Sequence, residues 1–140
     1  MQNSLKRRER RGVAVVEAAL FLPLLFLLVF GMVEYGWAFL KFECINNAAR
    51  EGVRAAVRDG ATDAVWQAAV DTVMRDCGKT PGTPPPSTTR TLSPGVDSPR
   101  GTQLTCTVTV NYSDLDLLNV SLFPVPTTLT ASATMNKEGS

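Results

Sequence analysis

Glu17 is the ionisable residue whose surroundings most require an explanation. It stands directly before sixteen residues, Ala18 to Val33, that carry no charge, and an ionised carboxylate at the centre of a bilayer costs roughly 2.5 to 3.5 kcal/mol on insertion scales. One explanation is that Glu17 lies one turn inside a cytoplasmic membrane interface and reaches back to Arg11 or to water. The other is that the chain is cut after Gly12, which leaves the amine of Val13 one helical turn from the carboxylate, or beside it in a neighbouring helix.

The three cysteines are the other residues whose types suggest chemistry. Cys77 closes an expected helix and Cys106 falls on the apolar side of an expected strand, so a disulfide between them is predicted if the strand covers the helix. Pairing of Cys44 with either one, and three free thiols, remain open. The cysteine spacing lacks a metal-ligand pattern, and the chain has no histidine, which excludes histidine bases, Ser-His-Asp triads and histidine-ligated metals. We therefore expect no enzyme, and no catalytic, cofactor-binding or metal site.

A basic leader precedes the apolar run. Residues 1–12 hold five Lys or Arg against Glu9, a formal charge of +4, and basic flanks remain in the cytoplasm. We predict a cytoplasmic leader over 1–12, a transmembrane helix over 13–42 and an amphipathic extension of the helix over 43–60, because apolar residues keep recurring at three- and four-residue steps. Without the leader the overall charge of +1 becomes −3 (+1 minus +4), so we expect no nucleic-acid partner.

The rest of the chain predicts a small domain. Residues 61–78 have the pattern of a second short helix, and the Pro-rich stretch 79–101 is expected to be a solvated loop, because proline ends helices and central strands. Period-two alternation over 104–112 and 129–135 predicts at least two antiparallel strands within a β-hairpin-like region, 102–140. The predicted fold class is α+β, with a long N-terminal transmembrane helix continuing into an amphipathic helix, a second short helix and a small antiparallel β-sheet.

One set of residues has a pattern that is specific at the level of a family. A basic leader is followed by a glycine, four small or apolar residues, a glutamate and a long apolar helix, and the full set is Gly12, Glu17, Pro23, Gly31, Glu34, Gly36, Ala48, Ala49, Arg50, Glu51 and Gly52. Together with the ending "LTASATMNKE", this set resembles the TadE-like family, which comprises pseudopilins of the tight adherence (Tad, or Flp) type IV pilus system.

The resemblance implies a bitopic protein of the bacterial inner membrane, with a single span, a cytoplasmic N-terminus and a periplasmic C-terminal domain. It implies that a prepilin peptidase cuts between Gly12 and Val13, and that other pilins or pseudopilins of the Tad system are the assembly partners. Glu17 would then serve assembly by pairing with an amine, and Pro23 by loosening the helix. The implied function is that of a non-catalytic minor pseudopilin of an adhesion pilus, either incorporated into the extracellular pilus or retained at its base, with no small-molecule substrate and no cofactor.

Two other functions remain open on the sequence. A signal-anchored or secreted small extracytoplasmic protein would not be processed as a prepilin, but the apolar run is longer than the usual signal-peptide core of about 7 to 15 residues. A membrane-anchored enzyme has less support, because no paired carboxylates stand in a recognisable catalytic frame.

Overall fold

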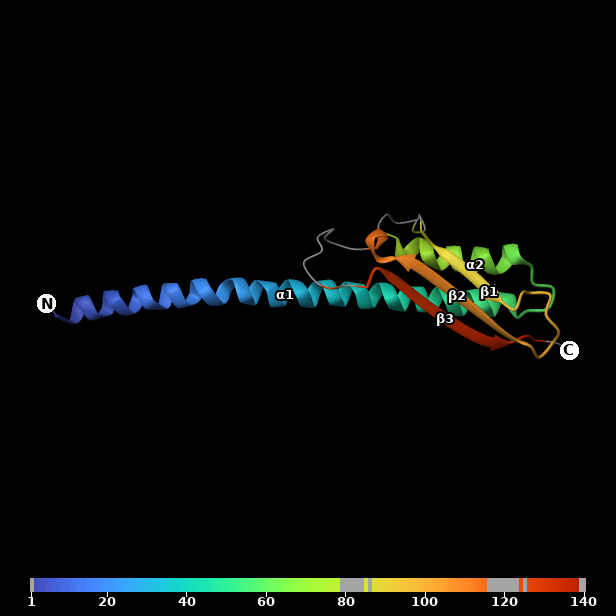
Figure 1. Ribbon diagram of the computed structural model, residues 1–140, viewed down its shortest axis with the longest axis horizontal. Helices are drawn as coiled ribbons and strands as arrows, with labels where there is room; N and C mark the ends of the chain where they lie inside the picture. The colour runs from blue at the N-terminus through green and yellow to red at the C-terminus, as the bar shows by residue number, and fades with distance from the viewer. Residues whose placement is uncertain (1, 79–84, 86, 116–123, 125, 139–140) are drawn as a thin grey trace. The chain divides into compact units, whose positions relative to one another are not determined.

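The computed structural model describes residues 2–78, 85, 87–115, 124 and 126–138. In chain order its elements are α1 (Gln2–Ala56), α2 (Asp63–Cys77), β1 (Thr89–Ser93), β2 (Gln103–Asn111), the 3₁₀ turn η1 (Tyr112–Asp114) and β3 (Thr128–Asn136) (Figure 1). The chain separates into two compact units, residues 1–34 and residues 35–140, called here the N-terminal unit and the C-terminal unit. The predicted α+β class, with a long N-terminal helix, a second helix and an antiparallel sheet, is confirmed.

Helix α1 is longer at its N-terminus than the sequence pattern indicated. It begins at Gln2, so it includes most of the segment expected to be a separate leader. At its other end the amide of Val57 donates to the carbonyl of Val53 at 3.0 Å. Gly60 then adopts φ +72°, a left-handed conformation that glycine accepts without strain and that stops a helix.

Helix α2 presents one apolar side to the rest of the C-terminal unit. Thr62 is its N-cap residue in extended conformation, without a side-chain capping bond, and its carbonyl accepts the amides of Val65 and Trp66 at 3.0 and 3.4 Å. The residues buried on α2 are Trp66, Val70, Met74 and Cys77. These positions follow the three- and four-residue spacing of one helix face, whereas Val65 is half exposed.

The three strands form an antiparallel sheet in the order β1-β2-β3. The central strand β2 alternates between buried and less buried positions along its length, and Cys106 on it lies opposite Leu92 of β1 and Ala133 of β3. Strands β2 and β3 correspond to the two alternating stretches 104–112 and 129–135. The alternation was therefore a sound guide to strands with one buried face.

Strand β1 lies inside the stretch 79–101, which the sequence indicated was a loop. Its five residues pair with Ser93 opposite Thr105 and Thr89 opposite Thr109, and Pro94 follows it directly. Proline is compatible with the end of an edge strand, because that position need not donate to a ladder on both sides. Residues 79–84 and 86 of the expected loop lie outside the described part of the chain.

The outer face of the sheet carries hydroxyl side chains in three cross-strand rows. The rows are Thr89–Thr109–Thr130, Thr91–Thr107–Ser132 and Ser93–Thr105–Thr134. Hydroxyls of Thr105 and Thr134 lie 2.8 Å apart, and those of Thr109 and Thr130 lie 3.0 Å apart. Such cross-strand pairs favour the sheet, and they leave its other face to form the core.

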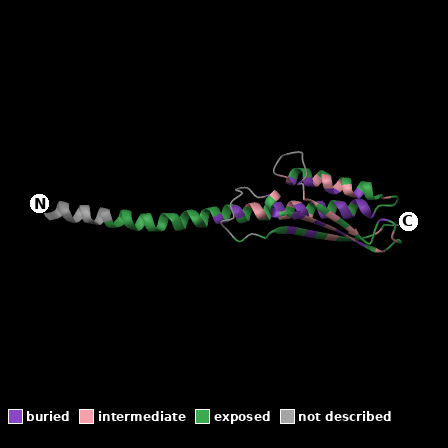
Figure 2. Cartoon of the chain, turned by 45° about the horizontal axis from the view of Figure 1, so that its top comes forward, coloured by how far each residue is buried: buried purple, intermediate pink, exposed green. Residues whose placement is uncertain are grey.

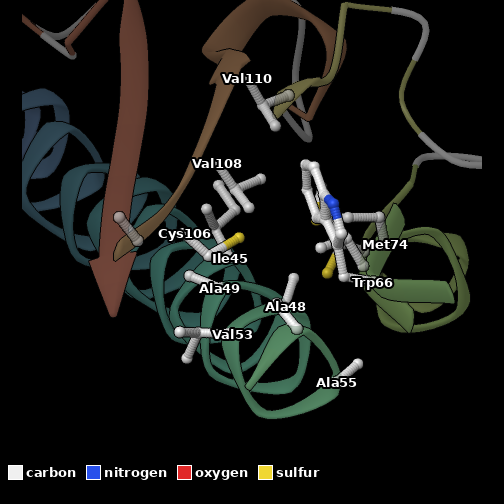
Figure 3. Close-up of a cluster of buried hydrophobic side chains, with 14 of the residues drawn as sticks. Ile45, Ala48, Ala49, Val53, Ala55, Trp66, Met74, Cys106, Val108 and Val110 are labelled. Carbon is white, nitrogen blue, oxygen red and sulfur yellow. The ribbon is translucent and has the colours of Figure 1, made fainter. Parts of the chain in front are cut away.

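The core of the C-terminal unit lies where α1, α2 and the inner face of the sheet meet. Figure 3 shows side chains from all three elements pointing into one cluster, among them Ile45 and Ala49 of α1, Trp66 of α2, and Val108 and Val110 of β2. These five residues are at most 3% exposed. Small residues on α1 allow the sheet to approach the helix closely, so a modest number of side chains excludes water from the interior.

Candidate membrane-spanning and assembly segment

The N-terminal unit exposes an apolar helix (Figure 2). From Val13 to Phe30 every residue is exposed, and the large apolar side chains there range from 45% exposed at Val29 to 73% at Leu20. This part of α1 contains a window of mean hydropathy 2.7, none of it buried. About 20 apolar residues in a helix suffice to cross a bilayer, and one helix in the described part of the chain meets that requirement. Its length, composition and exposure suit a membrane anchor.

The residues that the sequence singled out in this unit are successive positions on one helix rather than parts of a pocket. Val13 is 68% exposed and Glu17, four residues later, is exposed as well, about 6 Å further along the axis. Helix α1 continues through Pro23, where the missing amide leaves the carbonyl of Ala19 without its usual partner. The side chains of residues 1–12 lie outside the described part, so the surroundings of Gly12 are not described.

In the C-terminal unit, three side chains near the start of that unit's part of α1 donate hydrogen bonds to three other segments. The hydroxyl of Tyr35 donates to the carbonyl of Pro124 at 3.1 Å, and the indole Nε1 of Trp37 donates to the carbonyl of Leu115 at 2.7 Å. Lys41 Nζ donates to the carbonyl of Cys77 at 2.8 Å and lies 4.5 Å from the centre of the Trp37 ring. We call Tyr35, Trp37 and Lys41 the donor collar.

The donor collar explains how a lysine is tolerated inside this unit. Lys41 is 4% exposed, and burying an ammonium group is costly unless hydrogen-bond acceptors and nearby electron density compensate. The Cys77 carbonyl stands at the C-terminal end of α2, where the helix dipole is negative, and the Trp37 ring adds a cation–π contact. No sequence pattern indicates this arrangement, because its three carbonyl acceptors belong to residues far along the chain.

The cysteine pairing differs from the one expected. The disulfide joins Cys44 of α1 to Cys77 of α2, with the Cα atoms 6.0 Å apart, whereas the sequence favoured Cys77 with Cys106. Cys106 is a buried free cysteine whose Sγ lies against Gly52. Gly52 is eight residues beyond Cys44, about 12 Å along the helix axis. The C-terminal end of α2 and the middle of β2 therefore reach different levels of α1, and only Cys44 is beside Cys77.

At Gly52, both α2 and β2 approach α1 closely. A Cβ atom added to Gly52 would lie 2.5 Å from Val70 Cγ2 and 2.8 Å from Cys106 Sγ. Burial raises the pKa of the Cys106 thiol to about 11, because a low dielectric disfavours the thiolate. Gly52 thus has a packing role, and Cys106 is a small apolar filler beside it.

The charged residues near the C-terminal end of α1 are on its surface. Glu51 and Arg54 form an ion pair of 3.7 Å, with side chains 50% and 63% exposed. Exposed pairs of this kind contribute little to stability. Among the described residues no group of three or more cysteine or acidic side chains is arranged to hold a metal ion.

Comparison with known families covers the helix just described. Residues 12–54 match the family model of the TadE-like proteins. The resemblance seen in the sequence is thereby confirmed over this TadE-like segment, which associates the chain with Tad pilus systems. The ending "LTASATMNKE" lies outside the matched range. No curated protein and no solved structure matches the chain.

The TadE-like segment coincides with two structural features. Its first part is the exposed apolar helix of the N-terminal unit, and its last part is the portion of α1 that carries the donor collar, Cys44 and Gly52. The matched residues therefore include both the exposed apolar helix and the side chains through which α1 contacts the rest of the C-terminal unit.

Proposed function

We propose that this chain is a minor pseudopilin of a Tad/Flp pilus, a non-catalytic structural or assembly component that packs against other subunits through α1. The observation that carries the proposal is that the TadE-like match, residues 12–54, covers an apolar helix whose surface is exposed from Val13 to Phe30. An apolar surface of this extent requires lipid or other apolar helices as its surroundings. Both are offered by a pilus assembled from membrane-anchored subunits.

The same proposal gives the chain an orientation in the inner membrane. The basic residues before Gly12 remain cytoplasmic, and the C-terminal unit lies in the periplasm. The Cys44–Cys77 disulfide supports this orientation, since disulfides form and persist in oxidising compartments such as the periplasm.

Processing by a prepilin peptidase between Gly12 and Val13 is part of the proposal. The cut creates a cationic amine at Val13, four residues from Glu17. In a low-dielectric helix bundle an amine and a carboxylate stabilise each other strongly, and an unpaired charge is penalised. Glu17 of one subunit therefore selects the position of the Val13 amine in its neighbour, while Pro23 weakens the helix next to this pair.

The test is a count of surface pili in a strain that lacks this chain and is complemented with variants. The wild-type chain should restore pili, whereas Glu17→Leu should not, because the carboxylate that pairs with the amine is gone. Glu51→Leu is the matched control, since Glu51 is an exposed carboxylate in the same helix but within the C-terminal unit. A pilus count that is unchanged by loss of the chain would contradict the proposed function.

Mass spectrometry of the mature protein tests the processing step separately. The chain isolated from cells with an active prepilin peptidase should lack Met1–Gly12, and Gly12→Leu should retain these residues. An intact leader in the wild-type chain would contradict cleavage and would favour an unprocessed signal-anchored protein. An N-terminus near residue 40 in the culture medium would instead favour a secreted protein.

A further inference from the structure

Strand β3 is an outer strand of the sheet (Figure 1), and its main chain faces two directions in turn. In an antiparallel ladder the amide and the carbonyl of one residue point to the same side, and those of the next residue point to the other. The carbonyl of Thr127 accepts the amide of Tyr112 at 2.9 Å. The amide of Lys137 donates to the carbonyl of Thr102 at 2.8 Å. The odd-numbered residues of this stretch therefore face β2.

The even-numbered residues of β3 consequently direct their amides and carbonyls away from β2. They are exposed, and we call them the open edge: Thr128, Thr130, Ser132, Thr134 and Asn136. Glu138 continues the same alternation, because its amide donates to the carbonyl of Val57 on this side at 3.0 Å. From residue 128 to residue 136, the described part of the chain supplies no main-chain hydrogen bond on this side.

The open edge lacks the features by which proteins prevent an outer strand from pairing. Such features include short length, proline, lysine and bulges. Strand β3 has nine residues, and none of them is charged or a proline. Its register with β2 is one-to-one from Thr128 to Asn136, so no bulge interrupts it. The open edge can therefore accept another strand along its whole length.

Strand β1, the other outer strand, is closed by comparison. It has five residues, and because its odd-numbered residues face β2, Arg90 and Leu92 are the two that direct their main chain outwards. At one end Pro94 has no amide. At the other end the amide of Thr88 already donates to the carbonyl of Pro85 at 3.2 Å. Of the two outer strands in the described sheet, β3 is therefore the one that offers a full set of donors and acceptors.

The inner side of β3 leaves apolar surface uncovered next to the open edge. Leu129 and Ala131 are 7% and 4% exposed, whereas Ala133 is half-buried and Met135 is 37% exposed. Met135 lies opposite Leu104 of β2, which is fully buried. A strand added at the open edge would place every second side chain beside this surface, and the burial of apolar area favours the addition.

A second copy of this chain does not fit the open edge. Antiparallel pairing of two β3 strands would reverse α1 in one copy, whereas copies anchored in one membrane point the same way. Parallel pairing of two open edges would turn one sheet over, so the outer face with its hydroxyl side chains would continue as the apolar face of the other copy. The first exclusion rests on the proposed function, and the second follows from the sheet order alone.

We propose that the open edge binds an extended, uncharged segment of a different protein, which joins the sheet as a fourth strand beside β3. Main-chain hydrogen bonds supply the affinity in this kind of strand addition, and alternate side chains supply the specificity. On one side of the segment, hydroxyl or β-branched residues continue the rows that end at Thr130, Ser132 and Thr134. On the other side, apolar residues cover Ala133 and Met135. The segment is uncharged because β3 has no charged side chain to pair with it.

Photo-cross-linking in cells that carry the full-length chain tests this proposal. Thr128→Cys, at one end of the open edge, is labelled with a benzophenone maleimide. The label is selective, because Cys106 is buried and the other two cysteines are paired. We expect an adduct with a different protein, mapped by mass spectrometry to an uncharged segment in which apolar residues alternate with hydroxyl or β-branched ones. Thr72→Cys, exposed on α2, is the matched control and should not form this adduct.

Two outcomes of the cross-linking would overturn the proposal. One is the absence of an adduct from the Thr128→Cys variant. The other is an adduct with a second, differently tagged copy of this chain, or with a charged or helical segment of another protein.

Two substitutions of Ser132 separate main-chain pairing from side-chain contact. Ser132→Pro removes an outward amide but no hydrogen bond to β2. It should lower the adduct from Thr128→Cys roughly tenfold or more, because one main-chain hydrogen bond is lost and its acceptor is left unpaired. Ser132→Ala keeps the amide and should retain the adduct. Equal adducts from both variants would overturn main-chain pairing.

Amide hydrogen exchange of the purified full chain in detergent shows whether Ser132→Pro is folded. The amides of Leu129 and Ala131 bond to β2, so they should exchange as slowly in this variant as in the wild type. A synthetic peptide with the sequence of the cross-linked segment should slow exchange at Thr130 and Thr134 of the wild type. This peptide result decides if Ser132→Pro does not fold, and unchanged exchange at both residues would overturn the proposal.

These results are separable from the proposed function. Loss of pili on deletion of the chain, combined with absence of an adduct from the Thr128→Cys variant, would overturn the strand addition and support the function. Pili that persist after deletion would overturn the function, while the adduct with a different protein would still support the strand addition.

Discussion

The close approach at Gly52 gives the sharpest test of how the C-terminal unit is packed. In the change Gly52→Ala, the new methyl group would lie 2.5 Å from Val70 Cγ2 and 2.8 Å from Cys106 Sγ. Val70 is β-branched and stiff, and Cys106 is held on the central strand between two neighbours. Because these obstacles come from two different elements, relieving one does not relieve the other.

The magnitude follows from two opposing effects. Replacing glycine by alanine within a helix ordinarily stabilises by about 0.5–1 kcal/mol, while overpacking a filled core costs about 1–3 kcal/mol. With two contacts below 3.0 Å, the cost belongs in the upper part of that range. We therefore expect Gly52→Ala to lower the free energy of unfolding by about 1–2 kcal/mol. Gly36→Ala, where nothing lies within 4 Å of the added Cβ, should raise it by about 0.5–1 kcal/mol.

Urea unfolding of the full chain in detergent, followed by tryptophan fluorescence, measures both variants. Trp66 is 3% exposed, so its emission reports opening of the core. The double variant Gly52→Ala/Val70→Ala should lose less than the two single losses added together, with a coupling of about 1 kcal/mol. If Gly52→Ala proved as stable as Gly36→Ala, the argument for close packing at this point would be wrong.

Three further predictions follow from the C-terminal unit. Replacing Cys77 by alanine should lower the free energy of unfolding by about 2–4 kcal/mol, since the disulfide to Cys44 closes a loop of 33 residues; added reductant should leave this variant unchanged while destabilising the wild type. Cys106 should resist alkylation at pH 8 until urea is added. Because its pKa is raised from 9.0 to about 11, the stability that Cys106 contributes should be complete below pH 9 and should fall as the pH rises towards 11. A Cys106→Ala variant should lack this fall. Lys41→Met should cost about 1–2 kcal/mol in the same urea titration, because the Cys77 carbonyl loses its donor and Trp37 its cation; an unchanged midpoint would contradict that role.

Local patterns in the sequence were sufficient for the features that depend on local physics. The uncharged run after Glu17 predicts an apolar helix, and the alternations over 104–112 and 129–135 predict β2 and β3, because periodicity follows directly from the geometry of each element. Strand β1 was missed for the same reason. Five residues among prolines are too few for their alternation to stand out, and their strand conformation depends on pairing with β2.

Features set by distant contacts could not be read from the sequence. The partner of Cys77 depends on the level at which α2 lies along α1, because Cys44 and the level of Cys106 are about 12 Å apart along that helix, roughly two turns. Gly52 belongs to the family pattern, but its packing role requires Val70 and Cys106 to be placed on either side of it. The donor collar is similar, since main-chain carbonyls have no sequence signature.

The Cys44–Cys77 disulfide has a mechanical consequence for a subunit held by its first helix. When the chain is pulled between its N-terminal helix and its C-terminus, the load passes at Cys44 directly through the sulfur atoms to Cys77. The 33-residue span between them, which would otherwise extend by roughly 110 Å, carries no tension. The end of α1 that bears Gly52, together with most of α2, therefore remains unloaded while the strands beyond Cys77 resist the pull.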